Sequence, residues 1–439
     1  MDYKAQIREK VNEIKKQGYN KICFWIPAYN VGGGTYYLCE IAKYLVENFD
    51  LDIYYMDFPD GYPSSLLKGS NVKILDYNTD DLDFCIKEPC VIVTNSTRVT
   101  MLKRMNPANK LLFWHYETVP CGWDSVLIKG EERNFLELTK KENAMVFHDW
   151  SSRNIFKQQF NIEFENKSYL YMFVNNKEAP VDNFELINPE EINIVWVGRA
   201  GNEKIYSIYN IMDNLAKYPT TLRKVFHIVG DGWRMNDLKK YSERYKDVIN
   251  FNFTGTIPKT ELDDFLKKHA DVVFAMGMSA IEGAALRIPS VVVQLDTKPI
   301  NGSDFYWLFD TKEYCVGILP SQKKDFDIEY TKFERILKDI YLNNQKEYLA
   351  KKCYDYYLDT FGDFERIVNS FLSYIIDSTL TAEKLKGCIK YMPYCTIRLV
   401  QKKFLNKVFH EEIIYDNKRY IYKNGKFKKT KAIKQGMNK

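Results

Sequence analysis

The stretch DVVFAMGMSAIEGAALRIPSVVV, residues 271–293, contains the pattern on which the fold prediction depends. Its valine-rich start predicts a strand, the small residues that follow predict a short helix, and a proline precedes a second valine run. A strand, a helix and a second strand in this order form a βαβ unit with parallel strands. Ligands of such sheets bind beyond the carboxyl ends of the strands, so the loops there are where we look for a site.

Two interpretations fit the start of the helix in this stretch. Ser279 and Glu282 have the spacing of a capping box, in which both side chains satisfy backbone N–H groups of the first turn. Alternatively, a helix N-terminus with little side-chain bulk binds a phosphate or a sugar, and Glu282 accepts hydrogen bonds from hydroxyl groups. Taken by itself, the stretch favours the cap, and the rest of the chain has to decide.

The same alternation of strands and helices occurs in two series along the chain. A polar stretch at 174–191, with the composition of a linker, separates them. This pattern predicts an α/β protein with two Rossmann-like, doubly wound parallel-sheet domains that face a cleft, followed by a basic C-terminal extension. The strands that we expect, besides those already given, lie at 21–26, 51–58, 90–95, 110–115 and 143–148 in the first series, and at 192–198, 224–232 and 248–255 in the second.

Length and composition agree with two globular domains. A chain of 439 residues is longer than chains that usually fold around a single hydrophobic core. It has no apolar run that approaches the ~18 residues of a membrane span, and its start does not resemble a signal peptide, which predicts a cytoplasmic protein. The nine cysteines contain no C-x-x-C pair, so we expect reduced thiols and neither a disulfide framework nor a zinc site.

The positive charge of the chain belongs to its C-terminal segment. Residues 381–439 hold 16 Lys or Arg and 4 Asp or Glu, so they carry +12, whereas the whole chain carries +5 and the first 380 residues therefore carry −7. Around 397–408, four apolar residues fall on one face of an expected basic helix. Such a segment suits an anionic membrane surface, and packing against the body of the protein is the alternative.

Charged and small residues follow the expected strands. Arg199 and Lys204 lie on one loop, which predicts a diphosphate clamp or, alternatively, two solvated surface charges. Gly230 belongs to a tight turn that either contacts a ligand through its backbone or simply joins a strand to a helix. His115 directly follows a strand and should face the cleft, with a structural role as the alternative.

The glycine cluster at 32–34 is a weak signal by itself. It does not complete the G-x-G-x-x-G fingerprint, and no acidic residue is expected at the required place after the second strand, which argues against NAD.

Several motifs together resemble glycosyltransferase family 4, whose members have the two-domain GT-B fold. The resemblance rests on VGRAGNEK, HIVGDG, the run from Phe251 to Val293 and TFGDFERIVNSFLSYI, with a looser match at GGGTYYLCEIA. It covers about residues 20–378. It implies an N-terminal acceptor-side domain at 1–175, a donor domain at 176–355, and a helix at 356–378 that crosses back to the first domain, while 379–439 has no counterpart.

The resemblance implies a role for each matching residue. Arg199 and Lys204 would hold the donor diphosphate, Glu282 would bind the ribose hydroxyls, and His115 would sit near the donor sugar. These four form the implied catalytic set. The other donor-binding positions are Gly33, Gly34, Gly198, Gly230, Gly277, Met278, Ser279 and Ala280. Family members transfer with retention of configuration and need neither a metal nor a cofactor, because cations and a helix dipole neutralise the leaving diphosphate.

One position departs from the family pattern. The family commonly has a second glutamate eight residues before Glu282, and here that residue is Phe274. The expected function is a retaining, metal-independent glycosyltransferase of polysaccharide biosynthesis. It would use a nucleotide sugar and a surface glycan or glycolipid acceptor, with no nucleic acid partner, in the cytoplasm or peripherally at the inner face of the membrane. The alternatives are a catalytically silent sugar-nucleotide-binding or scaffolding subunit and a GT-B-like nucleotide-sugar epimerase.

Overall fold

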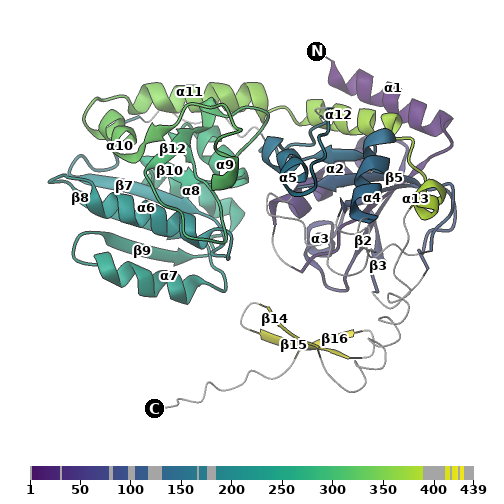
Figure 1. Cartoon of the computed structure of the whole chain (residues 1–439), viewed down its shortest axis with the longest axis horizontal. Helices are drawn as coiled ribbons and strands as arrows, with labels where there is room; N and C mark the ends of the chain where they lie inside the picture. The colour runs from purple at the N-terminus through teal and green to yellow at the C-terminus, as the bar shows by residue number, and fades with distance from the viewer. Residues whose placement is uncertain are drawn as a thin grey trace. The chain divides into compact units, whose positions relative to one another are not determined.

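The computed structural model describes most of the chain (Figure 1). The described residues are 2–29, 32–78, 83–96, 104–116, 131–165, 168–175, 184–388, 411–415, 418–423 and 426–429. By internal contacts they divide into two compact units. The first comprises residues 1–7, 115–120 and 146–371, and the second comprises residues 8–114, 121–145 and 372–439. The domain boundaries expected from the sequence stay predictions.

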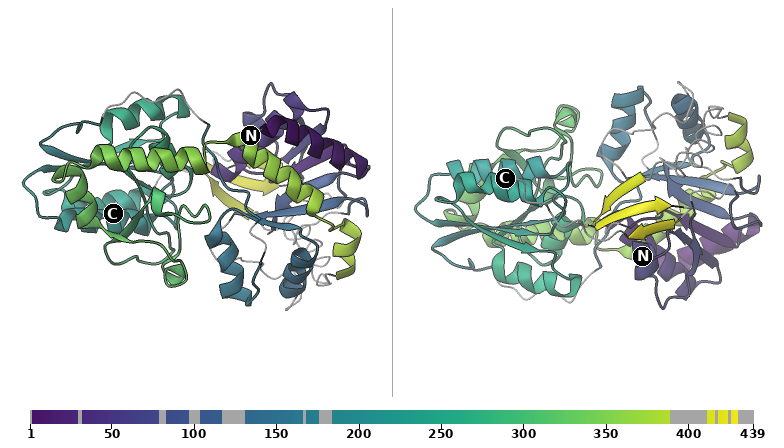
Figure 2. Two further views of the ribbon diagram at one scale, coloured as in Figure 1. Left: turned by 90° about the horizontal axis from the view of Figure 1, so that it is seen from above. Right: turned by 90° about the horizontal axis from the view of Figure 1, so that it is seen from below.

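The first series of strands forms a six-stranded sheet in the order β3-β2-β1-β4-β5-β6. Neighbours from β3 to β5 pair in parallel, which is the doubly wound arrangement that the sequence predicts. In both views of Figure 2, α2 and α4 lie on opposite sides of this sheet. The elements are α1 (Tyr3–Lys16), β1 (Lys21–Trp25), α2 (Gly33–Asn48), β2 (Asp52–Asp57), α3 (Tyr62–Leu66), β3 (Lys73–Asp76), β4 (Val91–Asn95), β5 (Lys110–His115), α4 (Glu131–Lys141), β6 (Met145–Phe147) and α5 (Trp150–Phe160).

The second series forms a seven-stranded sheet in the order β13-β12-β11-β10-β7-β8-β9. Its strands from β7 to β11 pair in parallel, as expected, whereas β12 and β13 are antiparallel additions that the sequence analysis missed. The elements are β7 (Glu191–Val197), α6 (Ile205–Lys217), β8 (Arg223–Val229), α7 (Met235–Ser242), β9 (Asn250–Gly255), α8 (Lys259–His269), β10 (Val272–Ala275), α9 (Met278–Ala285), β11 (Ser290–Val292), β12 (Asp304–Trp307), β13 (Thr331–Lys332), α10 (Phe333–Tyr341) and α11 (Lys346–Thr360), with short 3₁₀ turns at Glu243–Tyr245, Leu308–Asp310 and Pro320–Gln322.

The C-terminal part contains α12 (Phe364–Asp377), α13 (Ala382–Cys388) and three strands, β14 (Glu411–Tyr415), β15 (Lys418–Lys423) and β16 (Lys426–Lys429). The strands form an antiparallel sheet of three. The expected basic helix around 397–408 falls outside the described residues. Among those described, no helix has the length and apolar character needed to cross a membrane.

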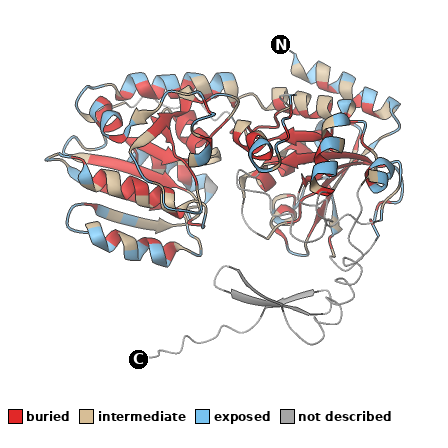
Figure 3. Ribbon diagram, viewed as in Figure 1, coloured by how far each residue is buried: buried red, intermediate tan, exposed pale blue. Residues whose placement is uncertain are grey.

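Buried residues concentrate on the strands and on the helix faces turned toward them (Figure 3). β4 and β5 are buried along their whole length, as are all residues of β7 after the first. Because parallel strands are covered by helices on both faces, they need continuous apolar runs, and this is why the valine-rich segments could be recognised in the sequence. A rigid sheet of this kind fixes the loops that follow its strands.

Candidate functional site

The loop after β7 carries the two expected cations and packs directly on the loop after β8. The Gly198 N–H donates to the Val229 carbonyl (2.9 Å), and the Ala200 N–H donates to the Asp231 carbonyl (3.0 Å). A Cβ atom at Gly230, where φ is +126°, would lie 2.0 Å from the Gly198 carbonyl oxygen. Glycine at 230 is therefore required by contact between two backbones, a reason that neither interpretation of this turn anticipated.

Arg199 is held by two neighbours within this loop region. Its guanidinium lies 3.3 Å from a Glu203 carboxylate oxygen and 5.0 Å from the centre of the Trp233 ring. The Arg199 side chain is 41% exposed, so the group is held in place and still open to solvent. A planar guanidinium in this state can bind two oxygens of a phosphate group.

Lys204 is the residue just before α6. Its ammonium group forms no hydrogen bond or ion pair with the residues that the structure describes. Burial lowers the pKa of Lys204, the Glu203 charge offsets part of this shift, and the Arg199 charge lowers the pKa further. A phosphate group beside Lys204 would favour the protonated ammonium and reverse this shift.

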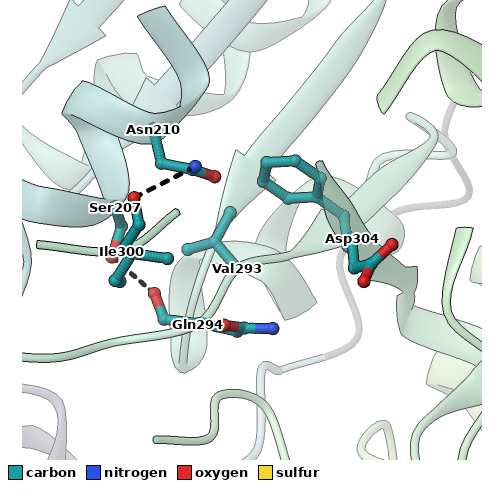
Figure 4. A pocket seen from close by; sticks show the side chains of 7 residues that line it. Ser207, Asn210, Val293, Gln294, Ile300 and Asp304 are labelled. Carbon is teal, nitrogen blue, oxygen red and sulfur yellow. Dashed lines mark hydrogen bonds between the residues drawn. The ribbon is translucent and has the colours of Figure 1, made fainter. Parts of the chain in front are cut away.

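A narrow crevice between α6 and the segment after β11 is lined by Ser207, Asn210, Gln294 and Ile300 (Figure 4). Its polar groups bond to each other: the Ser207 hydroxyl donates to the Gln294 carbonyl, and the Asn210 amide donates to the carbonyls of Ile300 and Gly302. These bonds hold the start of α6, and with it Lys204, against the neighbouring segment.

The start of α9 differs from the capping box expected there. The residue before the helix is Gly277, at φ +62° and ψ −143°, and no side chain caps the first turn. Ser279 is inside the helix, so the prediction that it pairs with Glu282 as a cap is wrong. The reason is that Gly277 adopts a left-handed φ and starts the helix two residues earlier. The Ala280 N–H donates to the Gly277 carbonyl (3.2 Å), so the N–H groups of Met278 and Ser279 are the ones that this uncapped helix start can offer to a ligand.

Glu282 lies on α9 and is 6% exposed. The helix rests closely on the sheet, because a Cβ atom at the next residue, Gly283, would come within 2.6 Å of the Ser290 hydroxyl and 3.1 Å of Val273. The carboxylate of Glu282 is thus carried by a firmly seated helix with a positive N-terminal dipole.

The structure explains the departure at Phe274. This residue belongs to β10 and is fully buried, with its ring against Phe305 (5.4 Å, interplanar angle 89°) and Phe333 (5.4 Å). Only Met276 and Gly277 connect β10 to α9. A carboxylate at position 274 would therefore be buried among aromatic rings, and position 274 serves the core.

The other expected site residues, Gly33, Gly34 and His115, belong to α2 and to β5 of the six-stranded sheet. Gly33 and Gly34 are the first two residues of α2, after an N-cap at Gly32 that has no side-chain bond. His115 ends β5 and is fully buried, with its ring 4.4 Å from that of Phe156. Burial against an aromatic ring suits the structural alternative, and the role of His115 near a sugar stays a prediction.

An acidic residue does end the second strand, contrary to the sequence-based expectation. Asp57 is the last residue of β2. However, its carboxylate accepts from the Ala28 N–H (3.0 Å) and from the N–H and hydroxyl of Ser64 (2.9 and 2.7 Å), so it ties two loops together.

Sheet order brings the loops that carry Arg199, Gly230 and Gly277 to one edge. β10, β7 and β8 are adjacent and parallel, so the loops that begin at Met276, Gly198 and Gly230 leave the same carboxyl edge. The sequence analysis missed three residues of this edge: Asn202, Glu203 and Trp233. Asn202 and Glu203 lie within the VGRAGNEK motif without having been assigned a role, Trp233 directly follows HIVGDG, and only the contact between the two loops reveals the place of all three.

Comparisons with known proteins bear on the fold. No protein-family model and no curated protein matches the chain. Among solved structures, HepE from Anabaena, in complex with UDP and glucose, is 12% identical, with 82% of this chain and 100% of that chain covered and a TM-score of 0.51. The lipopolysaccharide outer core galactosyltransferase WaaB in its apo form is 14% identical (82% and 100% covered, TM-score 0.51). The N-terminal domain of Candida albicans trehalose-6-phosphate phosphatase is 11% identical (82% and 97% covered, TM-score 0.52).

At these identities the likeness concerns the fold. The fold predicted from the sequence, GT-B with two Rossmann-like sheets in one chain, is confirmed.

Proposed function

We infer that the protein is a glycosyltransferase that moves a sugar from a nucleotide diphosphate to a surface glycan or glycolipid. The observation that carries this proposal is the shared edge of β7, β8 and β10, where Arg199 and Lys204 follow one strand and the uncapped start of α9 follows its neighbour. Cations and a helix N-terminus are the groups that bind a diphosphate. The complex of HepE with UDP and glucose gives an example of this fold with such ligands.

Each group has a distinct task in the proposed reaction. Arg199 and Lys204 bind the diphosphate, and the backbone from Met278 to Ala280 faces its distal phosphate and sugar, with the N–H groups of Met278 and Ser279 as donors. Glu282 accepts hydrogen bonds from the ribose. When the bond from the sugar to the phosphate oxygen breaks, negative charge grows on the diphosphate, and the two cations and the helix dipole stabilise it. We propose that the sugar is transferred with retention of configuration and that the enzyme uses neither a metal nor a further cofactor.

A second candidate function is favoured by Phe274. Because a core phenylalanine stands where the family commonly has a sugar-contacting glutamate, a sugar-nucleotide-binding subunit without transfer activity is the alternative. A nucleotide-sugar epimerase is the other enzyme that the same site could serve.

One experiment separates these functions. The full chain is incubated with a panel of nucleotide sugars, with and without lipid-linked and soluble glycan acceptors, and both released nucleotide and altered sugar are measured. A transferase releases nucleotide mainly when an acceptor is present. An epimerase changes the sugar without any acceptor, and a silent subunit binds the donor and releases nothing.

A further inference from the structure

Trp233 is a large aromatic residue that the protein leaves on its surface. Its side chain is 57% exposed, although burying an indole ring would be favourable. It directly follows Gly232, where a Cβ atom would come within 2.5 Å of the Ala200 carbonyl oxygen. The backbone that carries Trp233 is therefore seated on the loop that carries Arg199.

The indole ring is fixed at its edge. Its N–H donates to the side-chain oxygen of Asn202 (3.3 Å), and the same oxygen accepts from the Arg234 guanidinium (3.0 Å). Arg234 in turn is bound to Asp237 and donates its backbone N–H to the Ala200 carbonyl (3.1 Å). The ring is thus held at its N–H by an oxygen that Arg234 also binds, which restricts its orientation.

The face of this fixed ring meets Arg199, whose guanidinium lies 5.0 Å from the ring centre. A guanidinium over an indole face is attracted by the ring quadrupole, and this attraction leaves the N–H groups at its rim free for an anion. Glu203 holds the other side of the group at 3.3 Å.

We propose that Trp233 is a positioning residue that holds Arg199 ready for the donor diphosphate. This inference rests on the proposed function. It also assigns a role to Asn202, which keeps the ring in its plane. Preorganisation of this kind reduces the ordering required when the ligand binds.

The test compares wild type, Trp233→Leu and Trp233→Phe in calorimetric titrations with UDP, ADP, GDP and the matching nucleosides. For the best-bound base, we expect Trp233→Leu to weaken diphosphate binding about three- to tenfold and to leave nucleoside binding unchanged. Trp233→Phe, which keeps an aromatic face, should recover part of the loss. In an Arg199→Ala background, Trp233→Leu should have no further effect, because the group it positions is gone.

Two controls separate positioning from general damage. Tyr348→Leu removes another exposed aromatic side chain (59% exposed) and should not change binding. Asn202→Ala keeps the side chains of Trp233 and Arg199 but removes the oxygen that accepts from the indole N–H and from Arg234, and we expect a smaller loss of diphosphate affinity in the same direction.

Three results overturn the inference. Equal diphosphate affinity in wild type and Trp233→Leu shows that the ring does not position Arg199. An equal loss for nucleoside and diphosphate shows that the ring contacts the base instead. If the wild-type chain binds none of the three diphosphates, the proposed function is wrong and this inference fails with it. If the wild-type chain binds a diphosphate and Trp233→Leu binds it equally well, only this inference is wrong.

Discussion

The carbonyl oxygen of Gly198 occupies the space where a side chain at Gly230 would begin, 2.0 Å from an ideal Cβ position. The two residues belong to the loops after β7 and β8, and their backbones touch without any intervening side chain. The position of Arg199 thus depends on a glycine 31 residues away in the sequence.

We expect Gly230→Ala to displace the Arg199 loop, because the obstructing atom belongs to the backbone and cannot rotate away. Strain of this kind costs about 1–3 kcal/mol in stability. Nucleoside diphosphate binding, measured by calorimetry, should weaken as well. Gly69→Ala is the matched control: Gly69 also has a positive φ (+84°) but open space at its Cβ position, so the variant should lose stability without a change in binding. Unchanged binding in Gly230→Ala would contradict this dependence.

Alanine substitutions at Arg199 and Lys204 test the diphosphate clamp. Each charge-assisted hydrogen bond to phosphate contributes about 1.5–3 kcal/mol, so each variant should weaken nucleoside diphosphate binding roughly ten- to hundredfold. Nucleoside binding should stay the same, because neither cation would touch the base. Turnover should fall further than binding, since charge grows on the leaving group in the transition state.

Arg223→Ala is the control for the clamp. Arg223 is a 67% exposed cation at the opposite, amino end of β8, where it pairs with Glu191. Its removal should leave every affinity unchanged. If Arg199→Ala and Lys204→Ala behave like Arg223→Ala, both residues are solvated surface charges.

His227 predicts a pH-dependent stability for the unit that contains the seven-stranded sheet. It lies in β8, and its Nδ1 is 3.1 Å from the Asn252 side-chain nitrogen. Burial, followed by the nearby His269, lowers the pKa of His227 from 6.5 to about 4. Between pH 6.5 and about pH 4 the His227 imidazole is protonated in the unfolded chain and neutral in the folded protein. The free energy of unfolding therefore decreases as the pH falls through this range.

A difference of one pKa unit corresponds to about 1.4 kcal/mol, so the free energy of unfolding decreases by up to about 3 kcal/mol between pH 6.5 and about pH 4. His227→Gln removes the titrating group, and we expect its urea midpoint to fall less than that of wild type over the same pH range. Parallel pH profiles of the two proteins would show that His227 does not cause the effect.

Features that depend on residues close together in the sequence could be predicted, and features that depend on contacts between distant residues could not. Valine-rich strands and their helices leave local patterns, and they were located well. The start of α9 was misplaced because Ser279 and Glu282 fit a capping box, while the left-handed φ of Gly277 leaves no mark in the sequence. Trp233 was missed for a different reason: its importance comes from the contact between two loops, and no spacing along the chain encodes such a contact.

The charge of the basic C-terminal segment predicts peripheral binding to an anionic membrane surface, which a deletion tests. Residues 389–439 hold 14 Lys or Arg and 3 Asp or Glu. A deletion should begin at 389, because Leu385 is buried and Lys384 pairs with Glu142 at 2.5 Å. We expect this deletion to reduce sedimentation with phosphatidylserine vesicles and to leave nucleotide affinity unchanged, since each lysine near an anionic surface adds about 1 kcal/mol. If the shortened protein sediments with the vesicles as well as the full chain does, residues 389–439 do not form the membrane contact.

Glu282→Gln distinguishes a ribose contact from a diphosphate contact. Gly277 begins α9 without a side-chain cap, so the substitution removes no cap, and the amide fills nearly the same volume on this buried helix. One charged acceptor for two hydroxyl groups is lost, which costs about 1.5–3 kcal/mol, or roughly a tenfold or greater loss of affinity. Because the ribose is present in both ligands, nucleoside and nucleoside diphosphate binding should weaken by the same factor, unlike the pattern expected for Arg199 and Lys204. Glu334→Gln, at an exposed glutamate of α10, should change neither affinity. If Glu282→Gln lowers the melting temperature and leaves both affinities at the wild-type value, Glu282 is a structural carboxylate and the ribose is bound by another group.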